Sequence, residues 1–359
     1  MQKNVAILFG GKSAEHEVSV QSAKNILDAL DRNKYHPILI GIDKDGIWRL
    51  TSEDVLNAQI AKNGAFEPHN APSAALIPGS GGILLVNGLK SPAGIDVVFP
   101  VLHGPFGEDG TVQGLLKLAD IPFVGTSVLA SAVSMDKDVM KRLLRDAGLP
   151  IGKFLSLKSY ESLSFTDAVD ELGIPFFVKP ANMGSSVGVA KVHSAEEFGQ
   201  ALAQAFDYDT KIVLEEFIPG REIECSVLGN EEPLASLPGE IVSSREFYSY
   251  GAKYLDESGV HLEIPAKLPP KTIKIIQDLA VKVFKTLCCE GLGRVDFFLK
   301  PDGVPIINEI NAMPGFTKIS MYPKLWESTG LSYSTLIDRL ITLAMSRFEK
   351  EKRLKTSFF

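Results

Sequence analysis

Along the first third of the chain, short apolar runs alternate with segments whose apolar residues recur at helical spacing. Residues 5–9 and 35–42 are two such runs, which predict buried strands. Between them, apolar side chains recur at helical spacing from Val20 to Leu30. In the same way we predict a strand at 96–101, a helix at 111–119 and a strand at 121–124. Strands and helices that alternate in this order are typical of a parallel α/β domain.

The pattern changes after this first unit. The stretch at 57–89 is rich in Gly, Pro and Ala and has little periodicity, so we interpret it as an insertion. Ser134 is predicted to cap a helix at 135–147 that Gly148 ends. Hairpins with longer loops follow, which favours α+β structure. At 359 residues the chain is long enough for two or three domains.

Two carboxylates and an amide lie in two apolar-rich runs near the C-terminus, which flank a turn expected at 301–304 and predict a β-hairpin. In that register Asp296 faces Glu309. Arg294 then faces Asn311, and alternation puts all four side chains on one face. Like charges placed opposite each other destabilise a sheet, so we infer one or two Mg²⁺ ions at this face. A solvated face whose acids merely flank Arg294 stays open as the alternative.

A small-residue loop lies between a strand at 176–180 and a strand expected at 187–192. Gly184 and Gly188 would let backbone N–H groups approach an anion closely, and Lys179 offers a compact positive charge. We interpret this loop as a phosphate site, with a flexible hairpin tip as the alternative. Together the two hairpins predict a nucleotide held between the metal face and the glycine loop.

Two common nucleotide motifs are absent from the sequence. Gly11-Lys12-Ser13 resembles the end of a P-loop, but Ala6 stands where the first glycine of that motif belongs. No Gly-x-Gly-x-x-Gly occurs either. A P-loop kinase and a Rossmann dehydrogenase are therefore disfavoured.

Composition disfavours several other classes of protein. The hydrophobic fraction is 45%, the charged fraction is 23% and the net charge is −7 without a basic cluster, so no nucleic-acid partner is expected. Five consecutive apolar residues before Gly10 are too few for a signal peptide or a membrane span. The three cysteines form neither a disulfide framework nor a zinc pattern, which favours a cytoplasmic protein.

Four blocks of sequence, at 10–19, 102–110, 184–188 and 308–317, carry a resemblance that spans nearly the whole chain. Their residues and their order resemble those of the D-alanine–D-alanine ligases of the ATP-grasp superfamily. Two departures are Ala312, where threonine is frequent, and Phe217, where tryptophan is frequent. Neither departure removes a charged residue.

The resemblance implies an ATP-grasp fold behind an N-terminal parallel α/β domain. It implies a substrate-binding domain at 1–134, a central domain with the phosphate loop at 135–224 and a C-terminal domain at 225–359. It also implies that ATP activates one D-alanine as an acyl phosphate, which a second D-alanine attacks to form D-alanyl-D-alanine for peptidoglycan. The implied cofactor is a pair of Mg²⁺ ions, with Mn²⁺ as a substitute, and the implied assembly is a homodimer.

By the same resemblance, Asp296 binds one ion, Asn311 binds the other and Glu309 bridges them. Arg294 and the Gly315 backbone N–H would hold the tetrahedral oxyanion. The residues implied at the nucleotide are Lys137, Lys179, Glu215, Phe217, Glu222 and Lys253. Those implied around the D-alanines are Glu15, Ser185 and Tyr254, together with His103, Ser320 and Met321.

The segment 243–261 is polar, aromatic and glycine-containing, which favours a lid that keeps water from the acyl phosphate over a plain surface loop. Its Lys253-Tyr254 pair, by resemblance, favours an amine over D-lactate as the nucleophile. D-Serine as second substrate stays open. An inactive nucleotide-binding regulatory protein is disfavoured, since it would be expected to have lost Glu309, Arg294 or Lys179.

Overall fold

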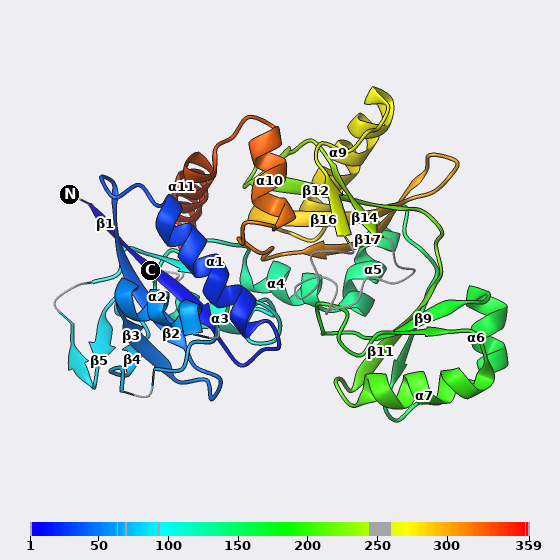
Figure 1. Ribbon diagram of the computed structural model, residues 1–359, viewed down its shortest axis with the longest axis horizontal. Helices are drawn as coiled ribbons and strands as arrows, with labels where there is room; N and C mark the ends of the chain where they lie inside the picture. The colour runs from blue at the N-terminus through cyan, green and yellow to red at the C-terminus, as the bar shows by residue number, and fades with distance from the viewer. Residues whose placement is uncertain are drawn as a thin grey trace.

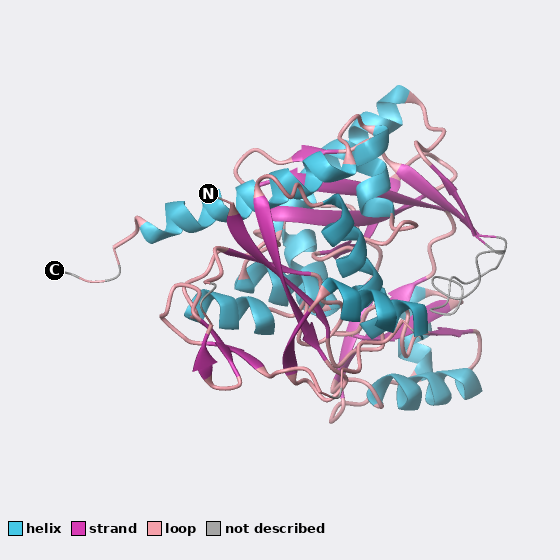
Figure 2. Cartoon of the chain, turned by 60° about the vertical axis from the view of Figure 1, so that its left-hand side comes forward, coloured by secondary structure: helices cyan, strands magenta, loops and turns pink. Residues whose placement is uncertain are grey.

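The computed structural model describes residues 2–62, 64–68, 70–91, 94–243, 260–355 and 357. Within these residues the strands form three larger sheets and one small sheet (Figure 1). Helices cover the sheets from outside, and the end of the C-terminal helix projects beyond the rest of the molecule (Figure 2). None of the helices in the described ranges is both long and apolar enough to cross a membrane.

The first sheet has the strand order β3-β2-β1-β7. Its strands are β1 (Lys3–Gly10), β2 (Tyr35–Ile42), β3 (Trp48–Thr51) and β7 (Val97–Pro100). β1 pairs in parallel with β2 and β7, which confirms the predicted parallel unit, and β3 adds an antiparallel edge. Helix α1 (His16–Ala29) packs on one face. The strand predicted at 121–124 is reduced to a bridge between Val98 and Phe123.

The stretch at 57–89 is more regular than its composition indicates. It holds the end of α2 (Glu53–Lys62) and a small antiparallel sheet of β4 (Ala74–Leu76), β5 (Leu84–Val86) and β6 (Leu89–Lys90). Each of these strands has only two or three residues, too few to produce a periodic pattern. Ala74 and Leu84 join the core on the outer face of the first sheet.

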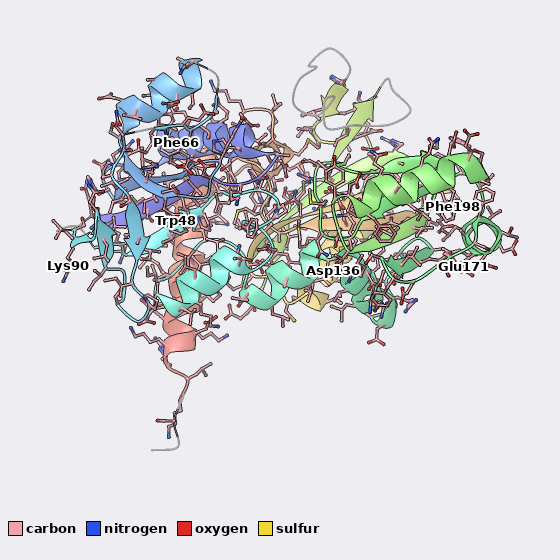
Figure 3. All side chains as sticks on the ribbon, turned by 90° about the horizontal axis from the view of Figure 1, so that it is seen from below. Trp48, Phe66, Lys90, Asp136, Glu171 and Phe198 are labelled. Carbon is pink, nitrogen blue, oxygen red and sulfur yellow. The ribbon has the colours of Figure 1, made fainter. Side chains whose placement is uncertain are left out.

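Three short helices connect the first sheet to the second: α3 (Thr111–Leu118), α4 (Val128–Met135) and α5 (Lys137–Asp146). The prediction that Ser134 caps one long helix is wrong. Ser134 lies in the last turn of α4, and the Asp136 carboxylate caps α5 by accepting from the Val139 N–H at 3.1 Å. Aspartate caps a helix as well as serine does, so the segment forms two helices. Figure 3 shows Asp136 between the part that holds Phe66 and the part that holds Phe198.

The second sheet has the order β10-β9-β11-β8 and is covered by α6 (Phe165–Leu172) and α7 (Ala195–Phe206) (Figure 1). Its strands are β8 (Phe154–Lys158), β9 (Phe176–Pro180), β10 (Ala190–Val192) and β11 (Lys211–Glu216). The strand predicted at 187–192 begins only at Ala190, because residues 184–189 form turns. In these turns the Val187 N–H donates to the Gly184 carbonyl at 3.1 Å.

The third sheet has the order β15-β14-β12-β16-β17, with β13 paired to β12. Its strands are β12 (Arg221–Gly229), β13 (Leu234–Ala235), β14 (Gly239–Ser243), β15 (Val260–Glu263), β16 (Gly291–Leu299) and β17 (Pro305–Asn311). Helix α9 (Pro270–Thr286) packs on the buried face of β12 and β16. The chain then returns to the first sheet through α10 (Met321–Ser328) and α11 (Tyr333–Lys352), which lies beside α1 (Figure 1).

The hairpin of β16 and β17 has the predicted facing pairs but not the predicted turn. Asp296 faces Glu309 and Arg294 faces Asn311, as expected. Next to the turn, however, Leu299 faces Pro305, one residue away from the predicted register. A β-bulge between Asp296 and Phe297 shifts the register by one residue. Because of this shift, the charged side chains face each other as predicted although the turn differs.

Candidate active site

A cavity of about 520 Å³ lies where the loop after β1, the glycine loop, the ends of β16 and β17 and the start of α10 meet. Ten residues predicted from the sequence line it: Glu15, His103, Lys137, Ser185, Arg294, Glu309, Asn311, Gly315, Ser320 and Met321. Lys179, Glu215, Phe217, Glu222 and Asp296 are not among the lining residues. Lys253 and Tyr254, with most of the predicted lid, lie outside the described residues.

Each carboxylate of the predicted metal face has a cation beside it. Arg294 donates from Nε to Asp296 Oδ1 at 2.8 Å and from Nη2 to Oδ2 at 2.7 Å. On the other strand, Lys137 Nζ lies 3.7 Å from Glu309 Oε2. The charge repulsion between the facing acids is thus offset by one guanidinium and one ammonium.

The oxygen atoms of this face suit Mg²⁺. Asn311 Oδ1 is buried and accepts no hydrogen bond from the residues that the structure describes, a costly arrangement that a cation would relieve. It lies two positions from Glu309 on β17, so both donors share a face. No three His, Cys, Asp or Glu side chains in the described ranges could hold a metal alone. Mg²⁺ needs no such cage, because it is usually held by one or two carboxylates and substrate phosphates.

The glycine loop is held in an unusual backbone conformation. Ser185 and Ser186 have φ values of 50° and 59°, in the left-handed region that few residues other than glycine occupy. Such residues cost about 1–3 kcal/mol each and cluster at functional sites. Lys137 Nζ donates to the Met183 carbonyl at 2.7 Å, and Ser185 Oγ donates to the Glu15 carboxylate. These contacts tie the loop to α5 and to the loop after β1.

A second group of charges lies on β9, β11 and α5. Lys179 Nζ and Lys141 Nζ lie 2.9 Å and 3.1 Å from the same oxygen, Glu215 Oε2. Burial raises the pKa of Glu215, but the charges of Lys141 and Lys179 outweigh it and lower that pKa below its usual value. Burial also lowers the pKa of Lys141. Phe217, two residues after Glu215, is 38% exposed, and its ring centroid lies 6.2 Å from that of Phe177.

A buried histidine, His103, also lines the cavity. His103 Nδ1 lies 3.1 Å from the Met313 carbonyl oxygen and 3.9 Å from Glu108 Oε1, whereas Nε2 has no hydrogen-bond partner within the described part of the chain. Burial lowers the pKa of His103, but the neighbouring Glu108 and Glu15 carboxylates raise it above its usual value overall. Nε2 is therefore the ring nitrogen that remains for a ligand bound in the cavity.

The start of α10 forms another part of the cavity wall. Ser320 is the N-cap residue, and its Oγ accepts from the Thr317 N–H at 2.9 Å. Met321 is the first helical residue, so its N–H has no partner within the helix. Backbone N–H groups and the helix dipole favour an anion such as a carboxylate at this point.

Comparison with known proteins identifies the family. A family model described as the D-ala D-ala ligase N-terminus matches residues 4–126, and a model of the C-terminus matches residues 143–342. The chain belongs to the D-alanine–D-alanine ligase family.

Individual relatives match over nearly the full length. The chain is 54% identical to the D-alanine–D-alanine ligase of Oceanobacillus iheyensis, with 99% of both chains covered. It superposes on the solved D-alanine–D-alanine ligase of Coxiella burnetii with a TM-score of 0.87 and 37% identity, covering 98% of this chain and 96% of that one. For the VanG D-Ala:D-Ser ligase of Enterococcus faecalis the TM-score is 0.86, the identity 38% and the coverages 96% and 100%. These structures confirm the predicted ATP-grasp fold class.

Three charged residues at the site of this D-alanine–D-alanine ligase family member were not predicted from the sequence. Lys141 lies one helical turn after Lys137, and this spacing could have placed both on one face of α5. Glu108 belongs to the block at 102–110 that carries the family resemblance. Glu224 follows Glu222 at strand spacing, but nothing local distinguishes it from an acid at a sheet surface.

Proposed function

We propose that this chain is a ligase that joins two D-alanines into D-alanyl-D-alanine and converts ATP to ADP and phosphate. Family membership and 54% identity to a D-alanine–D-alanine ligase support the reaction. The observation that carries the proposal is the convergence of Glu309, the unpartnered Asn311 oxygen, Arg294 and Lys137 in one cavity. Phosphate transfer and an oxyanion both require such a set of charges.

In the first step, a carboxylate oxygen of one D-alanine attacks the γ-phosphorus of ATP. The bond to ADP breaks and D-alanyl phosphate forms. Lys137 and Lys179 would offset phosphate charge, and the backbone of the glycine loop would approach the phosphates. Asp296, Glu309 and Asn311 would hold the Mg²⁺ ions, for which Mn²⁺ could substitute, and these ions supply charge neutralisation on the phosphates.

In the second step, the amine of the other D-alanine attacks the acyl carbon. A carbon–nitrogen bond forms, the carbon–oxygen bond to phosphate breaks, and the amine proton leaves to solvent. Arg294 and the Gly315 N–H are assigned to the tetrahedral oxyanion, where fixed donors stabilise developing charge. Ser320 and the Met321 N–H would receive the carboxylate of this second molecule, supported by their place at the start of α10.

The remaining assignments concern the first D-alanine and the nucleotide. Glu15, held by Ser185, would attract the ammonium group of the first D-alanine, and His103 would meet its carboxylate. The nucleotide base and ribose are assigned to Glu215, the exposed ring of Phe217 and Glu222, which begins β12.

The lid assignment rests on sequence alone. Lys253 and Tyr254 would close over the nucleotide, with Tyr254 near Glu15 and Ser185. A D-alanine–D-serine ligase is the second candidate, because the VanG D-Ala:D-Ser ligase has the same fold at 38% identity. D-Lactate as acceptor is the third. Competing D-alanine, D-serine and D-lactate in one reaction, followed by product analysis, separates the three.

We also propose domains at 1–134, 135–224 and 225–359, although α10 and α11 add Tyr322 and Leu340 to the core of the first sheet. The gap between the two family matches, at 127–142, supports the first boundary. A homodimer in the cytoplasm, where ATP is available, completes the proposal. Its product would serve as a precursor for peptidoglycan.

The proposal is tested by phosphate release from protein mixed with MgATP and D-alanine. Release is expected with D-alanine and not with L-alanine. Equal release with both amino acids, or with neither, contradicts the proposed function.

A further inference from the structure

A third carboxylate continues the row of the proposed metal face onto the neighbouring strand. Glu224 on β12 faces Asp296 on β16, which in turn faces Glu309 on β17. Glu224 is only 6% exposed and lines the cavity. Three like charges side by side on one sheet destabilise it unless cations lie between them.

Arg294 is the cation between the first two. Its Nε lies 2.8 Å from Glu224 Oε2 and also 2.8 Å from Asp296 Oδ1. The side chains of Arg294 and Glu224 are 13% and 7% exposed, so their attraction is weakly screened by solvent. One guanidinium thus has two carboxylate partners, and they belong to different strands.

Glu224 and Asp296 have different roles in the proposed function. Asp296 is assigned to a metal ion, which would compete with Arg294 for the same oxygens. If Asp296 were the sole partner, Arg294 would either hinder the metal or leave its place when the metal binds. Glu224 supplies a second partner on the neighbouring strand β12, where it faces Asp296 and is not itself assigned to a metal ion.

We infer that Glu224 is a positioning residue for Arg294: it holds the guanidinium at the reacting carbon while Asp296 serves the metal. This inference rests on the proposed function. It predicts that both the charge and the length of the Glu224 side chain matter. If Glu224 only balanced the charge of Arg294, its negative charge would matter and the length of its side chain would not.

Two substitutions separate charge from position. Glu224→Gln removes the charge, so the ion pair of Arg294 with Asp296 becomes stronger and competes more strongly with the metal. We expect a loss of about 10- to 100-fold in both kcat and the affinity for Mn²⁺, measured by electron paramagnetic resonance with a non-hydrolysable ATP analogue. Glu224→Asp keeps the charge but withdraws the carboxylate. We expect its kcat to fall at least about tenfold, because a shift near 1 Å can cost about 100-fold, while its melting temperature stays near that of the parent.

Glu240→Gln is the matched control. Glu240 is equally buried and pairs with Arg221 at 2.6 Å, but on the opposite face of the same sheet. Its kcat and Mn²⁺ affinity should match those of the parent. A folded Glu224→Asp protein with the kcat of the parent would overturn the positioning role. So would losses of kcat and Mn²⁺ affinity in Glu240→Gln as large as those in Glu224→Gln. A parent enzyme without D-alanine-dependent phosphate release refutes the proposed function instead, while the Mn²⁺ measurement still reports the coupling of Glu224 to the metal face.

Discussion

Replacing Glu309 with glutamine should separate the stability of the hairpin from its chemistry. The substitution preserves the shape of the side chain and removes the charge assigned to both metal ions. In the structure, the Glu309 side chain is 33% exposed and Lys137 Nζ lies 3.7 Å from its Oε2. A partly exposed ion pair of this kind contributes less than about 1 kcal/mol to the free energy of unfolding. Urea unfolding should therefore change little.

Turnover should respond quite differently. Removing one charged or polar group that stabilises a transition state costs about 100- to 1000-fold in kcat. The assay is phosphate release at saturating D-alanine with MgATP varied. Asp338→Asn serves as the control, because Asp338 accepts from Tyr35 Oη at 2.8 Å and Lys34 Nζ at 3.0 Å and does not line the cavity. A folded Glu309→Gln protein with kcat within about threefold of the parent, against the large loss expected for a transition-state group, would refute the metal assignment.

Three further outcomes are expected. Tyr254→Phe should weaken discrimination against D-lactate by one hydrogen bond, about 0.5–1.5 kcal/mol; an unchanged ratio of dipeptide to depsipeptide would exclude a selective role. Lys141→Met should lower the free energy of unfolding by about 1–3 kcal/mol, since Lys179 remains on Glu215. The charge interactions that lower the pKa of Glu215 stabilise the fold above the ordinary pKa of that group, 4.5, and this stabilisation is lost at lower pH. The stability difference between Lys141→Met and the parent should therefore shrink as the pH falls below about 4.5; a difference that stays constant there would contradict the argument. Raising pH from about 6 to 9 should lower the KM for the second D-alanine far more than that for ATP, because nearby positive charge favours a free amine; equal responses would refute this argument.

Local patterns predicted the three parallel strands of the first sheet, β1, β2 and β7, and the facing pairs of the hairpin, but not the edge strand β3. The predicted pairing of Asp296 with Glu309 is confirmed although the predicted turn is wrong, because a bulge compensates for the shifted register. The alternation of buried and exposed positions constrains which side chains share a face, whereas turn geometry does not follow from a Pro-Asp-Gly sequence.

Other features depend on contacts between distant segments. Ser134 and Asp136 are both good caps, and the sequence alone could not decide between them. Lys141 and Glu224 acquire their roles only when α5 meets β11 and when β12 pairs with β16. The family resemblance located most of the site, but the balance of charges around Arg294 required the structure.

The transfer of oxygen from D-alanine to phosphate tests the central claim most directly. The proposed reaction passes through D-alanyl phosphate, so the phosphate leaves with one oxygen of the first D-alanine. With D-alanine labelled by ¹⁸O in its carboxylate, mass spectrometry should find one ¹⁸O in each released phosphate and D-alanyl-D-alanine in equal amount. Unlabelled phosphate, or ATP consumption without dipeptide, would contradict the account.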